Sequence, residues 1–141
     1  MPLHLQRLAM GLHNVVGGIP WKRGMVLDGG TVVLRLRDAP KKGGGILTWL
    51  DAHSGGEKPR VFKADPNRSF LDLTSSANVG PLMDWLLTYE VPFAVSHSGT
   101  VTLYYNGCPR FVPVEHPYAL EANTSAALAK AILIASDTEI P

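Results

Sequence analysis

The sequence predicts an α+β protein in which helices pack on an antiparallel sheet of five to seven strands. Three segments repeat apolar residues at helical spacing, and several others alternate apolar and polar residues beside glycine-containing turns, as hairpins do. Of the 141 residues, 45% are hydrophobic and 18% are charged. A chain of this length and composition can bury a core of its own, so we expect a single domain over residues 1–141 rather than disorder.

The first helix is expected over residues 4–16. Its leucines recur at helical spacing, and a glycine pair at 17–18 ends the pattern. Gly11 lies inside this segment and costs about 1 kcal/mol relative to alanine. The helix is therefore expected to depend on packing of its apolar face.

A hairpin is expected next, with strands over 25–27 and 31–37 around the turn Asp28-Gly29-Gly30. In the second strand, alternate residues point to opposite faces. One face is then apolar, and the other carries the guanidinium groups of Arg35 and Arg37.

The middle of the chain is less regular. Residues 39–45 hold two lysines and three glycines, which predicts a flexible basic loop. The apolar run 46–50 is too short for its period to distinguish helix from strand, and residues 53–56 interrupt it. Short strands are expected over 60–63 and 69–73, on the two sides of a proline-containing turn.

The second half predicts the order helix, strand, strand, strand, helix. These elements are expected over 78–90, 92–96, 100–105, 111–114 and 126–133. Residues 123–125 offer N-cap side chains to the last helix. The core residues expected on the helix faces turned to the sheet are Leu86, Leu87, Leu128 and Ile132.

Charge is divided unevenly along the chain. Residues 1–70 hold eleven basic and five acidic side chains, a net charge of +6, whereas residues 71–141 hold two basic and seven acidic ones, a net charge of −5. A basic, glycine-rich half therefore precedes an acidic half. The asymmetry favours an anionic partner, a head-to-tail homodimer, or two halves that face each other within one domain.

The chain lacks the sequence motifs that are typical of enzymes. It has no Walker A loop, GxGxxG, HExxH or GxSxG, no paired-carboxylate spacing, and a single cysteine. We therefore expect no cofactor, no metal and no enzymatic activity. The longest apolar run is too short for a membrane span and no secretory signal is visible, so a cytoplasmic location without membrane contact is expected.

Candidate binding residues come from the basic half and from one strand of the acidic half. Trp21 is expected as an exposed anchor beside two cations, and Arg35 and Arg37 share a strand face beside the basic loop. Adjacent tyrosines at 104 and 105 point to opposite faces, so one is expected in the core and the other at the surface. The full set is Trp21, Lys22, Arg23, Arg35, Arg37, Lys41, Lys42, Tyr104, Tyr105 and Arg110.

Residues 73–135 resemble a family of phage proteins. The stretch Thr74-Ser75-Ser76-Ala77-Asn78 precedes an amphipathic helix and a hairpin, and Glu121-Ala122-Asn123-Thr124 with Ala127 and Ala131 introduces the last helix. This layout is similar to that of small phage and prophage proteins with the phage ABA sandwich domain. The resemblance implies an α-β-α sandwich and a phage-encoded accessory protein, with no catalytic residues to carry over.

The sequence is compatible with three functions. The first is non-catalytic binding that inhibits a bacterial host protein or an anti-phage defence component in the host cytoplasm. The second is a sponge that sequesters a phosphorylated small molecule, such as a cyclic nucleotide signal, on the basic half. The third is a small enzyme of unknown reaction. A nucleic-acid partner lacks the aromatic platforms that stacking requires among the basic residues. A sponge predicts a basic cavity of a few hundred Å³, and an inhibitor predicts a surface without one.

Overall fold

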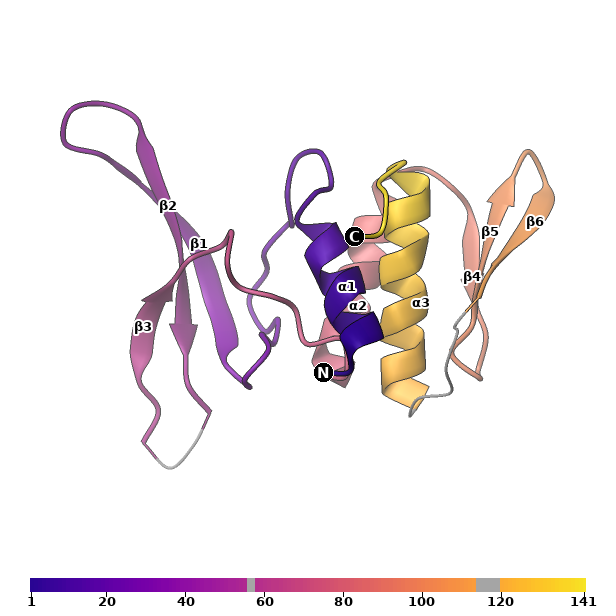
Figure 1. The fold of residues 1–141 in the computed structure, drawn as a ribbon, viewed down its shortest axis with the longest axis horizontal. Coiled ribbons are helices and arrows are strands. Elements are labelled where there is room, and N and C mark those ends of the chain that lie inside the picture. The colour runs from indigo at the N-terminus through magenta and orange to yellow at the C-terminus, as the bar shows by residue number, and fades with distance from the viewer. Residues whose placement is uncertain (56–57, 114–119) are drawn as a thin grey trace.

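The computed structural model describes residues 1–55, 58–113 and 120–141. Figure 1 shows the helices in the middle of the molecule, with a small antiparallel sheet on each side. Along the chain the elements are α1 (Leu3–Leu12), β1 (Val32–Pro40), β2 (Ile46–His53), β3 (Val61–Ala64), the short 3₁₀ helix η1 (Ser76–Asn78), α2 (Val79–Leu87), β4 (Phe93–Val95), β5 (Val101–Tyr105), β6 (Cys108–Val112) and α3 (Leu120–Ala135).

The α+β class is confirmed, but the single sheet is wrong. The strands form two three-stranded antiparallel sheets, in the orders β1-β2-β3 and β4-β5-β6. The reason lies in α3, whose residues from Ala126 to Ala129 and from Ala131 to Leu133 are buried on every side. A helix that is apolar all round must be covered all round. Helices α1 and α2 cover one side of α3, and strands β5 and β6 cover another.

The α-β-α sandwich expected for the second half is not formed either. Its two helices, α2 and α3, pack directly against each other instead of lying on opposite faces of a sheet. The expected order of helix, three strands and helix is present. The order of elements is thus a local property of the sequence, whereas the layering is set by contacts between distant segments.

Helix α1 ends at Leu12, four residues before the expected end. Successive turns follow, in which the Asn14 and Val15 amides donate to the carbonyls of Gly11 and Leu12. Val15 reaches the core through these turns, and Val16 faces solvent. Gly11 lets α1 and α3 approach closely, since a Cβ there would lie 3.1 Å from the Leu133 side chain of α3, which would have to shift to make room.

The expected first hairpin is present, and its second strand is longer than predicted. Val26 bridges to Val32, and the Leu27 amide donates to the Thr31 carbonyl at 2.8 Å. The strand continues as β1 to Pro40 and pairs with β2, which contains the untyped run 46–50. β3 matches the expected strand over 60–63, whereas 69–73 contributes only the bridge from Leu71 to Leu27.

Three expectations for the second half are wrong in detail. Leu86 is fully buried, but Leu87, the last residue of α2, is 60% exposed because the next position on a helix is turned by about 100°. Residues 123–125 lie inside α3 instead of capping it, since the helix begins at Leu120. The third strand begins at Cys108 rather than at 111, and residue 114, its expected end, lies outside the described residues.

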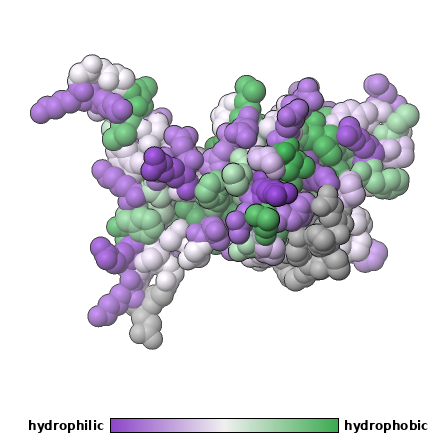
Figure 2. All heavy atoms as spheres, viewed as in Figure 1, coloured by the Kyte–Doolittle hydropathy of each residue, from purple (hydrophilic) through white to green (hydrophobic). Residues whose placement is uncertain are grey.

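The sheet β1-β2-β3, called the arm below, is attached to the body at one end only. Val33 and Leu50 join the hydrophobic core at its base. Its other end, the tip at residues 41–45, stands away from the helices (Figure 1). Figure 2 shows the arm set apart from the body, with hydrophilic and hydrophobic residues side by side on it. Among the described residues, no helix has the length and apolar character that crossing a membrane requires.

Candidate functional site

The predicted site residues lie in three separate places. Arg35, Arg37, Lys41 and Lys42 belong to the arm and its tip. Residues 21–23 lie in the loop between α1 and the first hairpin. Tyr104, Tyr105 and Arg110 belong to the sheet on the opposite side of the helices (Figure 1).

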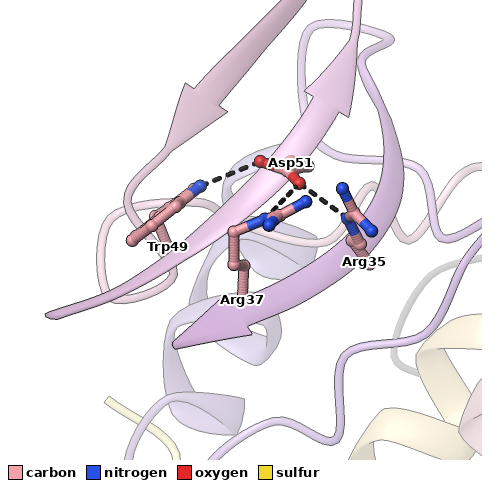
Figure 3. A network of polar contacts seen from close by, with 4 residues as sticks. All are labelled: Arg35, Arg37, Trp49 and Asp51. Atoms are coloured by element: carbon pink, nitrogen blue, oxygen red, sulfur yellow. Dashed lines mark hydrogen bonds and ion pairs between the residues drawn. The ribbon is translucent and has the colours of Figure 1, made fainter. Parts of the chain in front are cut away.

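On the arm, one carboxylate binds both arginines (Figure 3). Arg35 Nε donates to Asp51 Oδ2 at 2.8 Å, and Arg37 Nε donates to the same oxygen at 2.9 Å. The other carboxylate oxygen, Oδ1, accepts from Trp49 Nε1 at 2.8 Å. The Asp51 side chain is only 15% exposed, whereas those of Arg35 and Arg37 are 63% and 40% exposed. The carboxylate is thus covered by the groups that it binds.

Strand register brings these residues together. Arg35 lies opposite Asp51 and Arg37 lies opposite Trp49 in the β1–β2 pair. Side chains of directly opposite residues share one face of a sheet, so all four point the same way. Lys63 of β3 lies opposite Asp51 on its other side, which places a third cation on this face. We call Arg35, Arg37, Trp49, Asp51 and Lys63 the basic face of the arm.

A bulge in β1 corrects the predicted alternation. Simple alternation places Val33 on the same face as Arg35. The register shifts between these two residues, which inserts one residue into β1. Val33 therefore turns toward the core and is buried, while Arg35 stays exposed on the basic face. The bulge lets the base of the arm join the core and leaves its basic face in solvent.

The basic face carries a net charge of +2. Its three cations are balanced by Asp51 alone. The Lys63 amine lies 4.3 Å from the centroid of the Trp49 ring, a distance typical of a cation–π contact. The hydrogen bonds from Arg35 and Trp49 lower the pKa of the Asp51 carboxyl, and the charges of Arg35 and Lys63 lower it further. Asp51 is therefore ionised at neutral pH.

Most donors of the two guanidinium groups remain available. Each guanidinium has five N–H groups, of which the Nε–H is used by Asp51. No described residue accepts from the Nη atoms of either arginine. Planar guanidinium groups with outward Nη atoms bind carboxylates and phosphates through paired hydrogen bonds. The basic face is thus arranged to receive an anionic group.

A cavity of about 520 Å³ lies beside the basic face. Residues from the tip, from β2 and from the end of β3 line it, including Lys41, Trp49 and Lys63. Asp65 at the turn after β3 is an acidic group in the same lining. We call this cavity the edge notch. It meets the volume that a small-molecule sponge predicts, with two lysines and an indole in its lining.

The loop at residues 21–23 is not part of the basic face of the arm. Trp21 is half-buried against the core instead of exposed. The centroid of its ring lies 6.4 Å from that of the His13 ring, and the two rings are tilted relative to each other. It lines a smaller cavity of about 260 Å³ on the side of the arm opposite the basic face, together with Leu36 and Thr48. Lys22 pairs with Asp84 of α2 at 3.1 Å, which links the basic half to the acidic half.

The tyrosines also differ from the expectation. Tyr104 and Tyr105 are both 37% exposed, so neither is in the core. They lie at the end of β5, beyond the buried Val101 and Leu103. Arg110 and Cys108 on β6 are exposed as well. No described residue links this surface to the arm.

Sequence reasoning missed Asp51, Trp49 and Lys63. The faces of residues 46–51 carry no clear signal, since Leu47, Trp49 and Asp51 share one face and Ile46, Thr48 and Leu50 the other, so that each face mixes apolar and polar side chains. The apolar run 46–50 is also too short for its period to distinguish helix from strand. Once it is recognised as a strand, pairing across the glycine-rich loop places Asp51 near the arginines.

No protein-family model, curated protein or solved structure matches this chain significantly. Within the described part of the chain, no group of three or more histidine, cysteine, aspartate or glutamate side chains is placed to hold a metal ion. His116 lies outside that part. The candidate site therefore rests on the geometry of the arm alone.

Proposed function

We propose that this protein acts by non-catalytic binding, and that the basic face of the arm contacts an acidic surface of a protein partner. The observation that carries the proposal is the single carboxylate, Asp51, that binds Nε of both Arg35 and Arg37. It holds two guanidinium groups side by side and leaves their outer donors to solvent. Exposed ion pairs contribute little to folding stability, so the fold alone does not explain this arrangement.

A protein partner is favoured over nucleic acid by the surroundings of the basic face. Trp49 is the single aromatic residue of that face, and its ring is already in contact with Lys63. Successive stacking platforms for bases are therefore lacking. Ile46 and Leu47 on the neighbouring part of β2 are 69% and 47% exposed. Apolar side chains beside a charged cluster are typical of protein interfaces.

The class of partner follows from the sequence. The resemblance of residues 73–135 to phage proteins makes a bacterial host protein, or an anti-phage defence component in the host cytoplasm, the starting hypothesis. Inhibition follows if the arm covers a working surface of that protein. A homodimer remains a further prediction, although the apolar helix that suggested it, α3, is buried within the chain.

Affinity purification from bacterial lysate tests the proposal. Wild-type protein is compared with Arg35→Glu/Arg37→Glu and with a control, Arg7→Glu/Arg23→Glu, which makes the same charge change on exposed arginines outside the arm. We expect an acidic protein that is captured by the wild type and the control but not by the arm variant. Equal capture by all three proteins would contradict the proposal.

A second candidate function is the sponge, and the edge notch favours it. The notch has a volume of about 520 Å³, and its lining includes Lys41, Lys63 and Trp49. Lysines bind phosphate as point charges, and an indole can stack on a nucleobase. Native mass spectrometry of protein purified from bacteria, with titration of a cyclic dinucleotide, tests it. Binding that is lost in Lys41→Ala/Lys63→Ala supports the sponge, and no bound nucleotide in either measurement rejects it.

A further inference from the structure

Strand β2 has an open edge along half of its length. β1 pairs with β2 from Ile46 to His53, whereas β3 pairs only with the part from Leu50 to His53. After Ala64 the chain leaves the sheet through the turn at Asp65. Among the described residues, 46–49 therefore have a strand neighbour on one side and none on the other.

The backbone groups on this open edge can be assigned from the hairpin. The Lys41 amide donates to the Gly45 carbonyl at 3.0 Å, and hydrogen-bonded pairs alternate along an antiparallel ladder. Leu47 and Trp49 then bond to β1, while the N–H and C=O groups of Ile46 and Thr48 point to the open edge. Pro40, which has no N–H, lies opposite Ile46 as this assignment requires.

The edge notch runs along this edge. Four consecutive residues, 46–49, line it together with the end of β3 and the turn that follows. Consecutive residues of a strand point to opposite faces, so a cavity that all four line lies at the side of the strand, not above one face. The notch therefore occupies the place that a longer β3 would fill.

We propose that an extended acidic segment of the partner adds to β2 at this edge as a fourth strand, in line with β3. The inference rests on the proposed function and specifies which part of the partner the arm recognises. Proteins normally protect open strand edges, and peptides that add to such edges gain affinity through backbone hydrogen bonds. Here the strand is long enough to offer the N–H and C=O groups of Ile46 and Thr48.

The two faces of the arm specify an alternating pattern in that segment. On the basic face, Arg37 and Lys63 flank Trp49, so side chains pointing to this face are favoured as Glu or Asp. On the other face Ile46 and Thr48 lie next to the open edge, and Ile46 favours apolar neighbours. The partner segment is thus expected to alternate acidic and apolar residues.

A labelled peptide of alternating glutamate and valine, blocked at both ends, provides the probe. Its binding to the intact protein is measured by fluorescence anisotropy. Two peptide controls are matched to it, one with N-methyl groups on alternate backbone amides and one with glutamine in place of glutamate. We expect each control to bind about tenfold more weakly, because two backbone hydrogen bonds or the charge attraction is lost.

Two variants of the protein test strand addition by changing the open edge of β2 instead of the peptide. Thr48→Pro removes the N–H that faces the open edge without removing a bond to β1, and Thr48→Ala keeps this N–H. Both lose the hydrogen bond from Thr48 Oγ1 to Asp38, so the pair is matched in that respect. Circular dichroism melting shows that each variant is folded. We expect the proline variant to bind the peptide about three- to tenfold more weakly than the alanine variant.

The outcomes separate this inference from the proposed function. If the N-methylated peptide binds as well as the unmodified one, strand addition is wrong, and binding to acidic groups stands. If neither the peptide nor polyglutamate binds at low salt, the basic face does not recognise acidic protein and both proposals are wrong. If Thr48→Pro does not fold, the comparison of the N-methylated peptide with the unmodified peptide still tests strand addition.

Discussion

Asn78 and Val26 are joined by two hydrogen bonds that tie the start of α2 to the first hairpin. Asn78 Oδ1 accepts from the Val26 amide at 2.9 Å, and Asn78 Nδ2 donates to the Val26 carbonyl at 2.8 Å. The same Nδ2 group donates to the Asp72 carbonyl at 2.8 Å. The Asn78 side chain thereby substitutes for a strand neighbour, and it is fully buried. The Asn78 amide thus helps to position the base of the arm on the helices, together with the core contacts of Val33 and Leu50.

Replacing Asn78 with alanine is expected to destabilise the protein by about 1–3 kcal/mol, the cost of one buried backbone group left without a partner. That group is the Val26 amide, because the carbonyls of Val26 and Asp72 still accept from the amides of Asp72 and Ser75. Urea unfolding measures the change. Asn67→Ala, at an exposed turn position, is the control and is expected to cost less than about 0.5 kcal/mol. Similar effects of the two substitutions would show that the amide does not hold the hairpin.

The neighbouring leucines of α2 give a matched test of the core. Leu86 is fully buried and Leu87 is 60% exposed. Leu86→Ala should reduce the free energy of unfolding by about 2–5 kcal/mol, because it leaves a cavity among well-packed side chains. Leu87→Ala should change it by less than about 0.5 kcal/mol. A larger effect at Leu87 would mean that α2 presents a different face to the core.

Asp51 predicts a specific dependence of stability on pH. The hydrogen bonds from Arg35 and Trp49 lower the pKa of its carboxyl in the folded protein. The unfolded chain then binds a proton at about pH 3.9, before the folded protein does. The stability that the carboxylate contributes is complete above that pH and is lost as the pH falls through the lower folded-state pKa.

Comparison of wild type with Asp51→Asn measures this contribution. The urea midpoints of the two proteins are expected to differ most at neutral pH and to converge below about pH 4. A difference that stays constant from pH 7 to pH 3 would show that the carboxylate charge does not stabilise the basic face.

His13 also predicts that stability falls as the pH is lowered, but in a higher pH range than for Asp51. Burial lowers the pKa of its imidazole, and Nε2 is buried without a partner among the described residues. The unfolded chain therefore takes up a proton near pH 6.5 that the folded protein does not. Stability should fall as the pH drops from about 6.5 toward the lower folded-state pKa. His13→Phe, which keeps a ring against Phe70, should remove this part of the dependence. An unchanged pH profile in the variant would contradict it.

The helices and the hairpins could be predicted because their signals are local. Leucine spacing identified α1 and α2, and the glycine turn at 28–30 identified the first hairpin. The division into two sheets could not be predicted, because it depends on which distant segments cover α3. The position of Asp51 depends on strand register across the tip, and the direction of Val33 depends on a bulge beside it; neither has a period in the sequence.

Substitution of both arm arginines by lysine separates geometry from charge in the proposed binding. Arg35→Lys/Arg37→Lys keeps the net charge, but it removes the Nε that binds Asp51 and the paired Nη donors. Arg35→Gln/Arg37→Gln removes the charge as well. If oriented guanidinium groups recognise the partner, both double variants should bind polyglutamate more weakly than wild type.

The lysine variant should still lose affinity as salt rises, because exposed charges are screened beyond about 10 Å at 0.1 M salt. The unfolding midpoint should fall in both variants only by the part of the Asp51 contribution that depends on the arginine hydrogen bonds, since the arginines lie outside the core. Wild-type affinity in the lysine variant would mean that charge alone attracts the partner and that the Asp51 contacts have no part in binding.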